Sequence, residues 1–244
     1  MTSATPALSS DARRFRRLQR RLAPLFERIL PDPGAPRSVV VVPSLSVDTE
    51  VLSRISGAQH YEERMLCMLM LLRMPRTTVT FVTSEPVAPA IIDYYLHLLP
   101  GIPSHHARRR LTLLSCFDGS PRALTSKILE RPRLVQRIRD SIPDASLAHM
   151  TCFNATVSER SLALALDIPL YGCDPDLLPW GSKSGSREAF REAGVPCPDG
   201  FEHLRDAADV AEALTALKRR DPSLAPGASV ASAASGPAAI RYRR

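Results

Sequence analysis

The sequence predicts an α/β fold built on a Rossmann-like parallel sheet, followed by further helices and a disordered tail. Short β-branched runs alternate with segments of helical periodicity, which is the pattern of βαβ units in a parallel sheet. The first of these runs, Ser38 to Pro43, is apolar without alternation. We therefore expect it to be a strand that is buried on both faces.

The composition is that of a globular protein with one large domain or two small ones. The chain has 244 residues, of which 44% are hydrophobic and 23% charged. Its net charge of +7 suits an anionic partner. Arginine replaces lysine almost throughout, however, which a coding bias also produces, so the net charge by itself indicates no partner. No apolar run is long enough to span a membrane. Five cysteines without C-x-x-C spacing predict a reducing, cytoplasmic location.

Residues 1–36 are predicted to hold a basic amphipathic helix and a linker. Apolar side chains recur at helical spacing from Asp11 to Leu30, arginines occupy the other faces, and Asp11 is the candidate N-cap. Docking of this helix on the next domain is the ordinary outcome. Contact of its basic face with nucleic acid or a membrane surface is the alternative. We expect no membrane partner and no nucleic acid.

Residues 37–180 are predicted to form the parallel sheet domain, with right-handed crossovers. The expected strands are 38–43, 77–83, 111–116, 146–152 and 169–172. The expected helices are 61–73, 90–99, 124–130, 134–140 and 156–166. The last of them begins at Thr156, with Glu159 completing a capping box.

Polar side chains follow the predicted strands, where ligands bind in open parallel sheets. They are Ser44, Ser46, Ser84, Glu85, Asp118, Asn154 and Asp174. A functional rim is one interpretation. The other is that these residues cap helices and close turns, which is the more frequent role of each taken singly.

Familiar catalytic motifs are absent from the sequence. Pro43 to Ser46 stands where a dinucleotide-binding glycine loop would follow the first strand, and neither a Walker A pattern nor a G-x-S-x-G elbow occurs. The histidines and cysteines lack the spacing of metal ligands. We therefore name no catalytic residue and no metal ligand.

The stretch from Trp180 to Pro198 is the most informative segment. It predicts a short amphipathic helix that ends at Gly194, with two prolines just beyond. Lys183 falls at the helix start, where free backbone N–H groups and the helix dipole favour phosphate. An ordinary capped surface helix with a solvated lysine is the alternative.

Residues 174–198 resemble the entry into an ATP-grasp fold. The carrying pattern is Asp-Pro-x-Leu-Leu-x-x-Gly-x-Lys-Ser-Gly-Ser-Arg-x-x-Phe-x-x-Ala-Gly-Val-Pro-x-Pro after a Rossmann-like unit. With Val39 to Ser46 and Phe153 to Arg160, the chain resembles the pre-ATP-grasp segment of carboxylate–amine ligases related to the pheganomycin-type peptide ligase. The resemblance covers roughly residues 38–220.

The resemblance implies an enzyme that activates a carboxylate with ATP as an acyl phosphate, which an amine then attacks. ATP and Mg²⁺ are the implied cofactors, and carboxylate and amine substrates the implied partners. Lys183 matches a lysine that touches nucleotide phosphates. Ser184, Ser186 and Arg187 lie near it and are weaker candidates for cofactor binding.

The end of the chain departs from the family pattern. Residues 181–222 contain only the first ATP-grasp helices, and residues 223–244 have a composition that predicts disorder. A truncated, frameshifted reading frame is one hypothesis, under which the chain alone neither binds ATP tightly nor ligates. The alternatives are a non-catalytic Rossmann-like module that binds a nucleotide or metabolite, and an interaction protein that acts through the arginine-rich helix.

Overall fold

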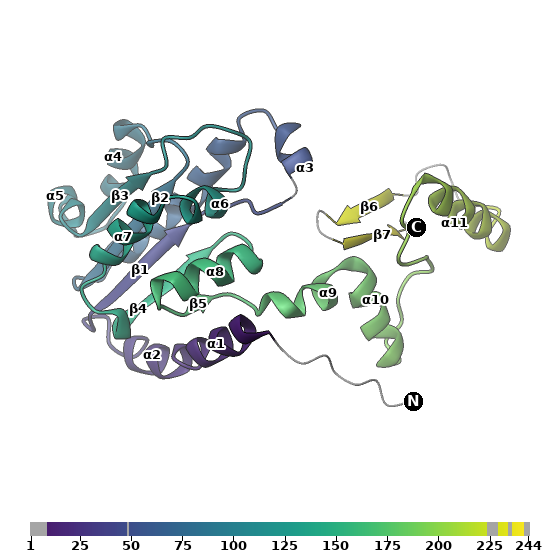
Figure 1. Cartoon of the computed structure of the whole chain (residues 1–244), viewed down its shortest axis with the longest axis horizontal. Helices are drawn as coiled ribbons and strands as arrows, with labels where there is room; N and C mark the ends of the chain where they lie inside the picture. The colour runs from purple at the N-terminus through teal and green to yellow at the C-terminus, as the bar shows by residue number, and fades with distance from the viewer. Residues whose placement is uncertain (1–8, 48, 224–228, 234–235, 242–244) are drawn as a thin grey trace. The chain divides into compact units, whose positions relative to one another are not determined.

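The computed structural model describes residues 9–47, 49–223, 229–233 and 236–241. The chain divides into two compact units, which we call the N-terminal unit (1–175) and the C-terminal unit (176–244). The N-terminal unit contains a five-stranded sheet of order β3-β2-β1-β4-β5, and every pairing in it is parallel (Figure 1). The predicted α/β fold with a Rossmann-like parallel sheet is therefore confirmed.

The strands occupy the positions that the sequence predicts. They are β1 (Arg37–Val42), β2 (Thr77–Thr83), β3 (Leu111–Ser115), β4 (Ala148–Cys152) and β5 (Leu170–Tyr171). All six residues of β1 are buried, as expected for a strand with a neighbour on each side and helices over both faces. The switch in strand order falls between β1 and β4.

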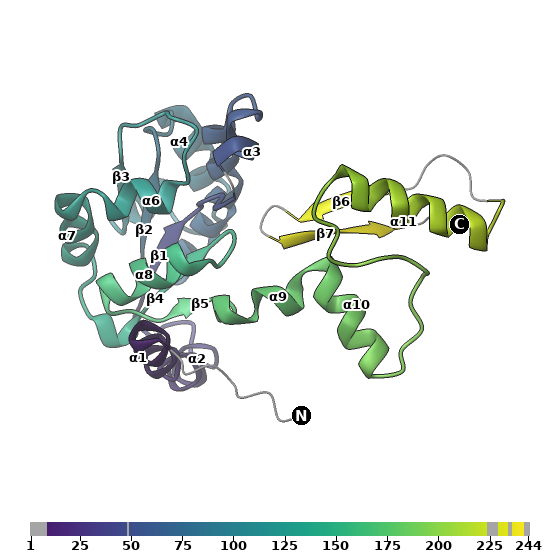
Figure 2. The ribbon, with the colours of Figure 1, turned by 45° about the vertical axis from the view of Figure 1, so that its right-hand side comes forward.

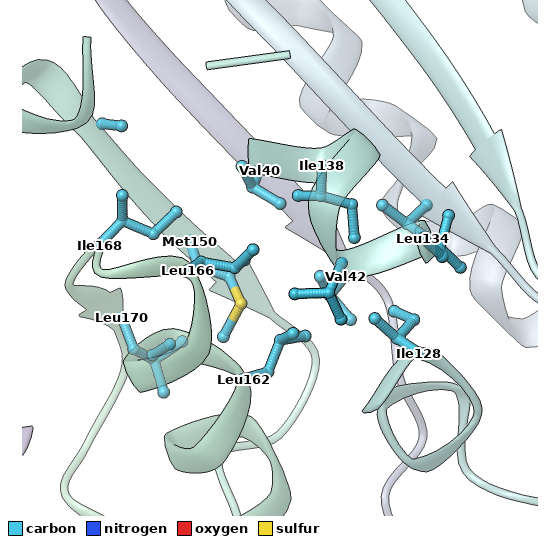
Figure 3. Close-up of a cluster of buried hydrophobic side chains, with 14 of the residues drawn as sticks. Val40, Val42, Ile128, Leu134, Ile138, Met150, Leu162, Leu166, Ile168 and Leu170 are labelled. Carbon is cyan, nitrogen blue, oxygen red and sulfur yellow. The ribbon is translucent and has the colours of Figure 1, made fainter. Parts of the chain in front are cut away.

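Helices cover both faces of the sheet, and the sheet separates two hydrophobic cores (Figures 1 and 2). On one face, Val40, Val42 and Met150 meet α6 (Leu124–Leu129), α7 (Pro132–Asp140) and α8 (Val157–Leu166), as Figure 3 shows. On the other, Val39, Val41 and Phe81 meet η1 (Ala58–Arg73) and α4 (Pro89–His97).

The N-terminal helix is two helices, α1 (Ser10–Gln19) and α2 (Leu22–Ile29), rather than one. Pro24 explains the break, because it has no N–H to donate and its ring would clash within a continuous helix. The cap prediction is also corrected: the Ser9 side chain, not Asp11, accepts from the Ala12 N–H at 3.1 Å. Phe15 and Leu18 are buried in the sheet's core, so docking is the role that the structure shows for the apolar face of α1.

The predicted helix 61–73 is a 3₁₀ helix, η1. Its apolar stripe repeats every three residues, with Leu66, Leu69 and Leu72 all fully buried. That period matches the three residues per turn of a 3₁₀ helix, in which side chains three apart line up. The capping box of α8 is present as predicted, with Thr156 as N-cap and Glu159 returning to its backbone.

The N-terminal unit also contains three short helices that the spacing of apolar residues in the sequence does not reveal. They are α3 (Thr49–Ser53), α5 (Ser104–Arg108) and the 3₁₀ turn η2 (Ala145–Leu147). Each is five residues or fewer, which is too short to show a helical repeat in sequence.

The C-terminal unit has a much smaller core. It contains η3 (Pro175–Leu177, which begins at the boundary), α9 (Leu178–Gly181), α10 (Lys183–Glu192) and α11 (Ala207–Arg220). Only Leu204, Ala213 and Leu217 are buried hydrophobic residues here, among those whose side chains are described. Asp206 caps α11 by accepting from the Asp209 N–H.

The stretch 223–244, predicted to be disordered, holds two short strands where it is described. They are β6 (Ser229–Ala233) and β7 (Gly236–Arg241), which pair antiparallel. Residues 224–228, 234–235 and 242–244 lie outside the described residues. Backbone pairing needs no large side chains, and a two-stranded ribbon of this kind is marginally stable by itself. The boundaries predicted at 36, 180 and 222 stay a prediction.

Candidate functional site

The start of α10 has the geometry of a capped helix N-terminus. The Ser182 side chain accepts from the Gly185 N–H at 3.0 Å and donates to the Pro179 carbonyl at 2.6 Å. Gly185 is needed because a Cβ there would stand 2.1 Å from the same carbonyl oxygen. Gly194, in the left-handed region at φ 66°, follows the end of the helix, where the sequence predicts a stop.

Lys183 lies on the exposed side of this helix start. Within the described part of the chain, its ammonium group has no hydrogen bond or ion pair. It is therefore a mobile cation beside the positive end of a ten-residue helix. This is the arrangement that the sequence predicts for contact with phosphate.

The other predicted binding residues are engaged by the protein itself. Ser184 is buried and accepts from the His203 N–H at 3.4 Å, and Ser186 donates to the Ser182 carbonyl at 2.7 Å. The Nε atom of Arg187 lies 2.6 Å from the Glu202 carboxylate, and both side chains are nearly buried, at 12% and 13% exposure. Lys183 and Arg187 are thus on the same helix but differ in availability.

Glu202 joins α10 to the segment that follows it. Burial by itself would raise the pKa of Glu202, but hydrogen bonds and charges from Arg187 and Arg191 outweigh burial and lower it. Arg191 reaches the same carboxylate at 2.9 Å. The ion pairs of Arg187 and Arg191 with Glu202 therefore hold the loop after α10 in place. A phosphate would have to compete with Glu202 for Arg187.

The strand-end residues beside the switch point bond to one another. The Ser46 N–H donates to Asn154 Oδ1 at 2.9 Å, and Asn154 Nδ2 donates to the Ser46 carbonyl at 2.8 Å. The Ser46 hydroxyl reaches Glu159, and the Ser44 hydroxyl accepts from the Thr125 N–H at 3.1 Å. The segments that follow β1 and β4, at the switch point where Rossmann-like sheets bind ligands, are thus joined by reciprocal hydrogen bonds.

A second group of strand-end residues surrounds a buried lysine. The Lys127 ammonium donates to the Ser84 hydroxyl at 2.9 Å and to the carbonyls of Asp118 and Ser120 at 2.7 Å. Ser84 in turn donates both its N–H and its hydroxyl to Glu62, at 2.6 Å each. Lys127 is 1% exposed and Glu62 6% exposed, and all three protons of the Lys127 ammonium group are used in hydrogen bonds within the N-terminal unit.

Burial sets the ionisation of this network. Burial raises the pKa of Glu62 above its ordinary value, although hydrogen bonds from Ser84 and the charge of Lys127 act to lower it. Burial lowers the pKa of Lys127, although the charges of Asp118 and Glu62 act to raise it. Hydrogen bonds from Ser120 and Arg131 lower the pKa of Asp118. A small cavity next to Glu62 and Lys127 is lined by charged, polar and apolar side chains and is too small for a metabolite.

The two remaining strand-end residues, Asp174 and Glu85, differ in their contacts. Asp174 lies 2.9 Å from Arg16 and 3.8 Å from Arg160, so it joins α1 to α8. The Glu85 side chain packs against Gly119, where a Cβ would approach its Oε1 to 2.8 Å. Sequence reasoning placed these residues at one edge correctly but missed Glu62 and Lys127, which lie inside helical segments and gave no motif.

The described residues contain no cluster of three or more His, Cys, Asp or Glu side chains that could hold a metal. Within the same residues, no helix is both long and apolar enough to cross a bilayer. The described carboxylates therefore do not form a site for a magnesium ion.

Two curated proteins are similar to this chain. L-propargylglycine–L-glutamate ligase from Streptantibioticus cattleyicolor is 33% identical over 193 residues, which cover 76% of this chain and 39% of the ligase. IQ motif-containing protein H from Danio rerio is 26% identical over 183 residues, which cover 68% of this chain and 17% of that protein. The chain spans less than half the length of either relative. No family model and no solved structure matches it. The comparisons therefore establish a distant relationship between this chain and part of a ligase.

Proposed function

We propose that this chain is the N-terminal part of an ATP-dependent carboxylate–amine ligase of the ATP-grasp family, and that it acts with further ligase sequence. The observation that carries the proposal is the 33% identity to L-propargylglycine–L-glutamate ligase over 76% of the chain. The Rossmann-like sheet followed by the capped helix α10 is the order of elements that the family resemblance implies.

Lys183 is the proposed nucleotide contact. It is exposed, belongs to a helix start, and has no partner within the described residues. When bound, ATP would supply the phosphoryl group that activates a carboxylate, and Lys183 would neutralise part of the phosphate charge. Ser184, Ser186 and Arg187 are proposed to shape the helix start. Arg187 does so through Glu202, and its guanidinium reaches a phosphate only after leaving that carboxylate.

No magnesium ligands are proposed among the described residues of this chain. The described residues form no metal cluster, so no step is assigned to a metal here. The ligands for Mg²⁺ and a second cation for the nucleotide are proposed to lie in ligase sequence outside the part that this chain matches. By itself the chain is then expected to bind Mg-ATP weakly and to be inactive in ligation.

The test is a calorimetric titration of the whole chain with Mg-ATP. We expect affinity weaker than micromolar, and we expect Lys183→Ala to weaken it about tenfold, the usual effect of losing one charge-assisted hydrogen bond. The matched control is Lys218→Ala, which removes an exposed lysine from the same unit. Thermal unfolding of the Lys183→Ala variant should be unchanged.

Two results would count against the proposal. Equal affinity of the Lys183→Ala and Lys218→Ala variants would remove Lys183 from the nucleotide site. Micromolar affinity of the unmodified chain would show that the nucleotide site is complete within it, which favours the self-contained binding module instead.

A further inference from the structure

The outer edge of β3 is open for hydrogen bonding. β3 is the last strand of the sheet and pairs only with β2 among the described residues. The Cys116 N–H donates to the Thr83 carbonyl and the Val79 N–H to the Arg110 carbonyl, both at 2.9 Å. Because these bonds alternate along a parallel pair, the N–H and C=O of Leu113 point to the open side.

A cavity of about 190 Å³ lies beside this edge. Its lining includes Thr83, Pro86, Val87, Leu113, Ser115 and Phe117, with Arg137 from α7 as its charged side chain. Leu113 is 39% and Phe117 76% exposed, although both are large and apolar. Phe117 also has φ 51°, a left-handed backbone that is costly for a bulky residue.

The sequence of β3 contains none of the usual edge protection. Natural edge strands carry proline, lysine, an inward charge or a bulge, which prevent another strand from adding to the sheet. β3 reads Leu-Thr-Leu-Leu-Ser and pairs in regular register with β2. Its backbone is therefore able to accept another strand.

Two unpaired cations flank the open edge. Arg109 precedes β3, and Arg137 borders the cavity near the carboxyl end of the strand; both are exposed and have no side-chain partner among the described residues. Their neighbours are occupied, since Arg108 pairs with Asp93 and Arg110 donates to three backbone carbonyls. The five residues of β3 between the two cations extend roughly 16 Å.

We propose that β3 is a docking edge for an extended peptide segment of a partner protein. The segment has about five residues with alternating apolar side chains, which matches the length of β3, and a carboxylate at each end. Its backbone pairs with Leu111, Leu113 and Ser115, an apolar side chain enters the cavity, and the carboxylates face Arg109 and Arg137. This inference does not depend on the proposed ligase function.

Charge selects this occupant over a second copy of the chain. Antiparallel pairing of β3 with its copy would bring Arg109 of one molecule beside Arg137 of the other, and like charges across a strand pair are destabilising. An acidic-ended peptide instead places an opposite charge at both positions. The same two cations that disfavour self-association therefore favour the acidic partner.

A fluorescent peptide, acetyl-Glu-Thr-Val-Thr-Val-Thr-Glu-amide, tests the proposal by anisotropy titration against the whole protein. We expect saturable binding, and little binding of the same peptide with lysine at both ends. Arg137→Glu should weaken binding about tenfold, because a repulsion replaces an attraction. The matched control is Arg133→Glu, which makes the same charge change at another exposed position of α7 and should leave binding unchanged.

Two further variants distinguish edge pairing from general charge attraction. Leu113→Pro removes the open N–H and should abolish binding. The Arg109→Glu, Arg137→Glu double variant should prefer the lysine-ended peptide, and this surface change keeps the test decisive if Leu113→Pro fails to fold. Equal weakening by Arg133→Glu and Arg137→Glu would overturn the proposal. So would a dimer of the unmodified chain that Leu113→Pro dissociates, because β3 would then pair with its own copy.

Discussion

The two units of the chain differ in how their side chains are supported. The N-terminal unit buries its sheet between two large cores, and most of the polar residues at its strand ends are hydrogen-bonded within the unit. In the C-terminal unit only three hydrophobic residues are buried among those whose side chains are described. Leu177, Leu178, Trp180, Phe190 and Val195 remain exposed there.

The difference in buried core shows which unit is the more stable scaffold. The N-terminal unit has two large cores, whereas a unit with as small a core as the C-terminal unit is marginally stable. Most of the strand-end polar groups, which look functional in the sequence, are hydrogen-bonded within the unit. Lys183, an exposed cation without a partner among the described residues, belongs to the unit with the smaller core. An adaptable site in a marginal unit is consistent with completion by further sequence.

The largest expected effect comes from the buried lysine. Lys127→Met removes the ammonium donor from the carbonyls of Asp118 and Ser120, of which Ser120 keeps the Arg122 N–H, and it removes a cation that lowers the pKa of Glu62. The free energy of unfolding should therefore fall by about 3–5 kcal/mol. Urea unfolding measures the change. Lys218→Met, at an exposed position in the C-terminal unit, is the control. An effect of Lys127→Met as small as that of the control would mean that the network does not support the scaffold.

Truncating one leucine in each unit sharpens the comparison. Leu69 is fully buried in η1, so Leu69→Ala should lower the unfolding free energy of the N-terminal unit by about 2–5 kcal/mol. Leu217→Ala makes the same truncation in α11 of the C-terminal unit and should leave the urea transition of the N-terminal unit unchanged. A single transition that both substitutions shift equally would show that the two units unfold together.

A smaller effect is expected from the ionisation of Glu62. Its pKa in the folded chain is raised above the ordinary value of about 4.5. The protonated form is thus favoured by folding, and the associated stability is full below that ordinary value and is lost as pH rises through the raised pKa. Glu62→Gln cannot ionise. The difference in unfolding free energy, variant minus unmodified chain, should therefore increase with pH across this interval.

Chemical denaturation at a series of pH values measures that difference. Subtracting the variant removes the opposite slopes of carboxyls with lowered pKa, such as Asp118. A difference that stays constant with pH would show that Glu62 titrates in the folded chain as it does in the unfolded one.

The sheet was predictable because its signal is local. A continuous apolar run such as Val39 to Val42 can be satisfied only by burial on both faces, and Thr156 with Glu159 marks a helix start within four residues. The break at Pro24 was also readable, although the periodicity of the flanking apolar residues obscured it. The period of three in η1 was present in the positions of Leu66, Leu69 and Leu72.

The networks could not be predicted because their partners are distant in sequence. Ser46 and Asn154 are 108 residues apart, and Ser84 and Lys127 are 43 apart. Sequence placed Ser46, Ser84 and Asn154 at the carboxyl ends of strands but could not decide whether they face a ligand or one another. Arg187 posed the same problem, since only the fold brings Glu202 beside it.

Hydrogen exchange on the whole chain, with and without Mg-ATP, tests the central claim most directly. The account predicts that amides of β1 and β4 exchange only through global unfolding, that those of α10 exchange through local opening, and that Mg-ATP slows exchange at residues 182–187. Uniformly slow exchange in both units would contradict the difference between them. Nucleotide protection at Ser46 and Asn154 instead would place the site at the switch point of the sheet.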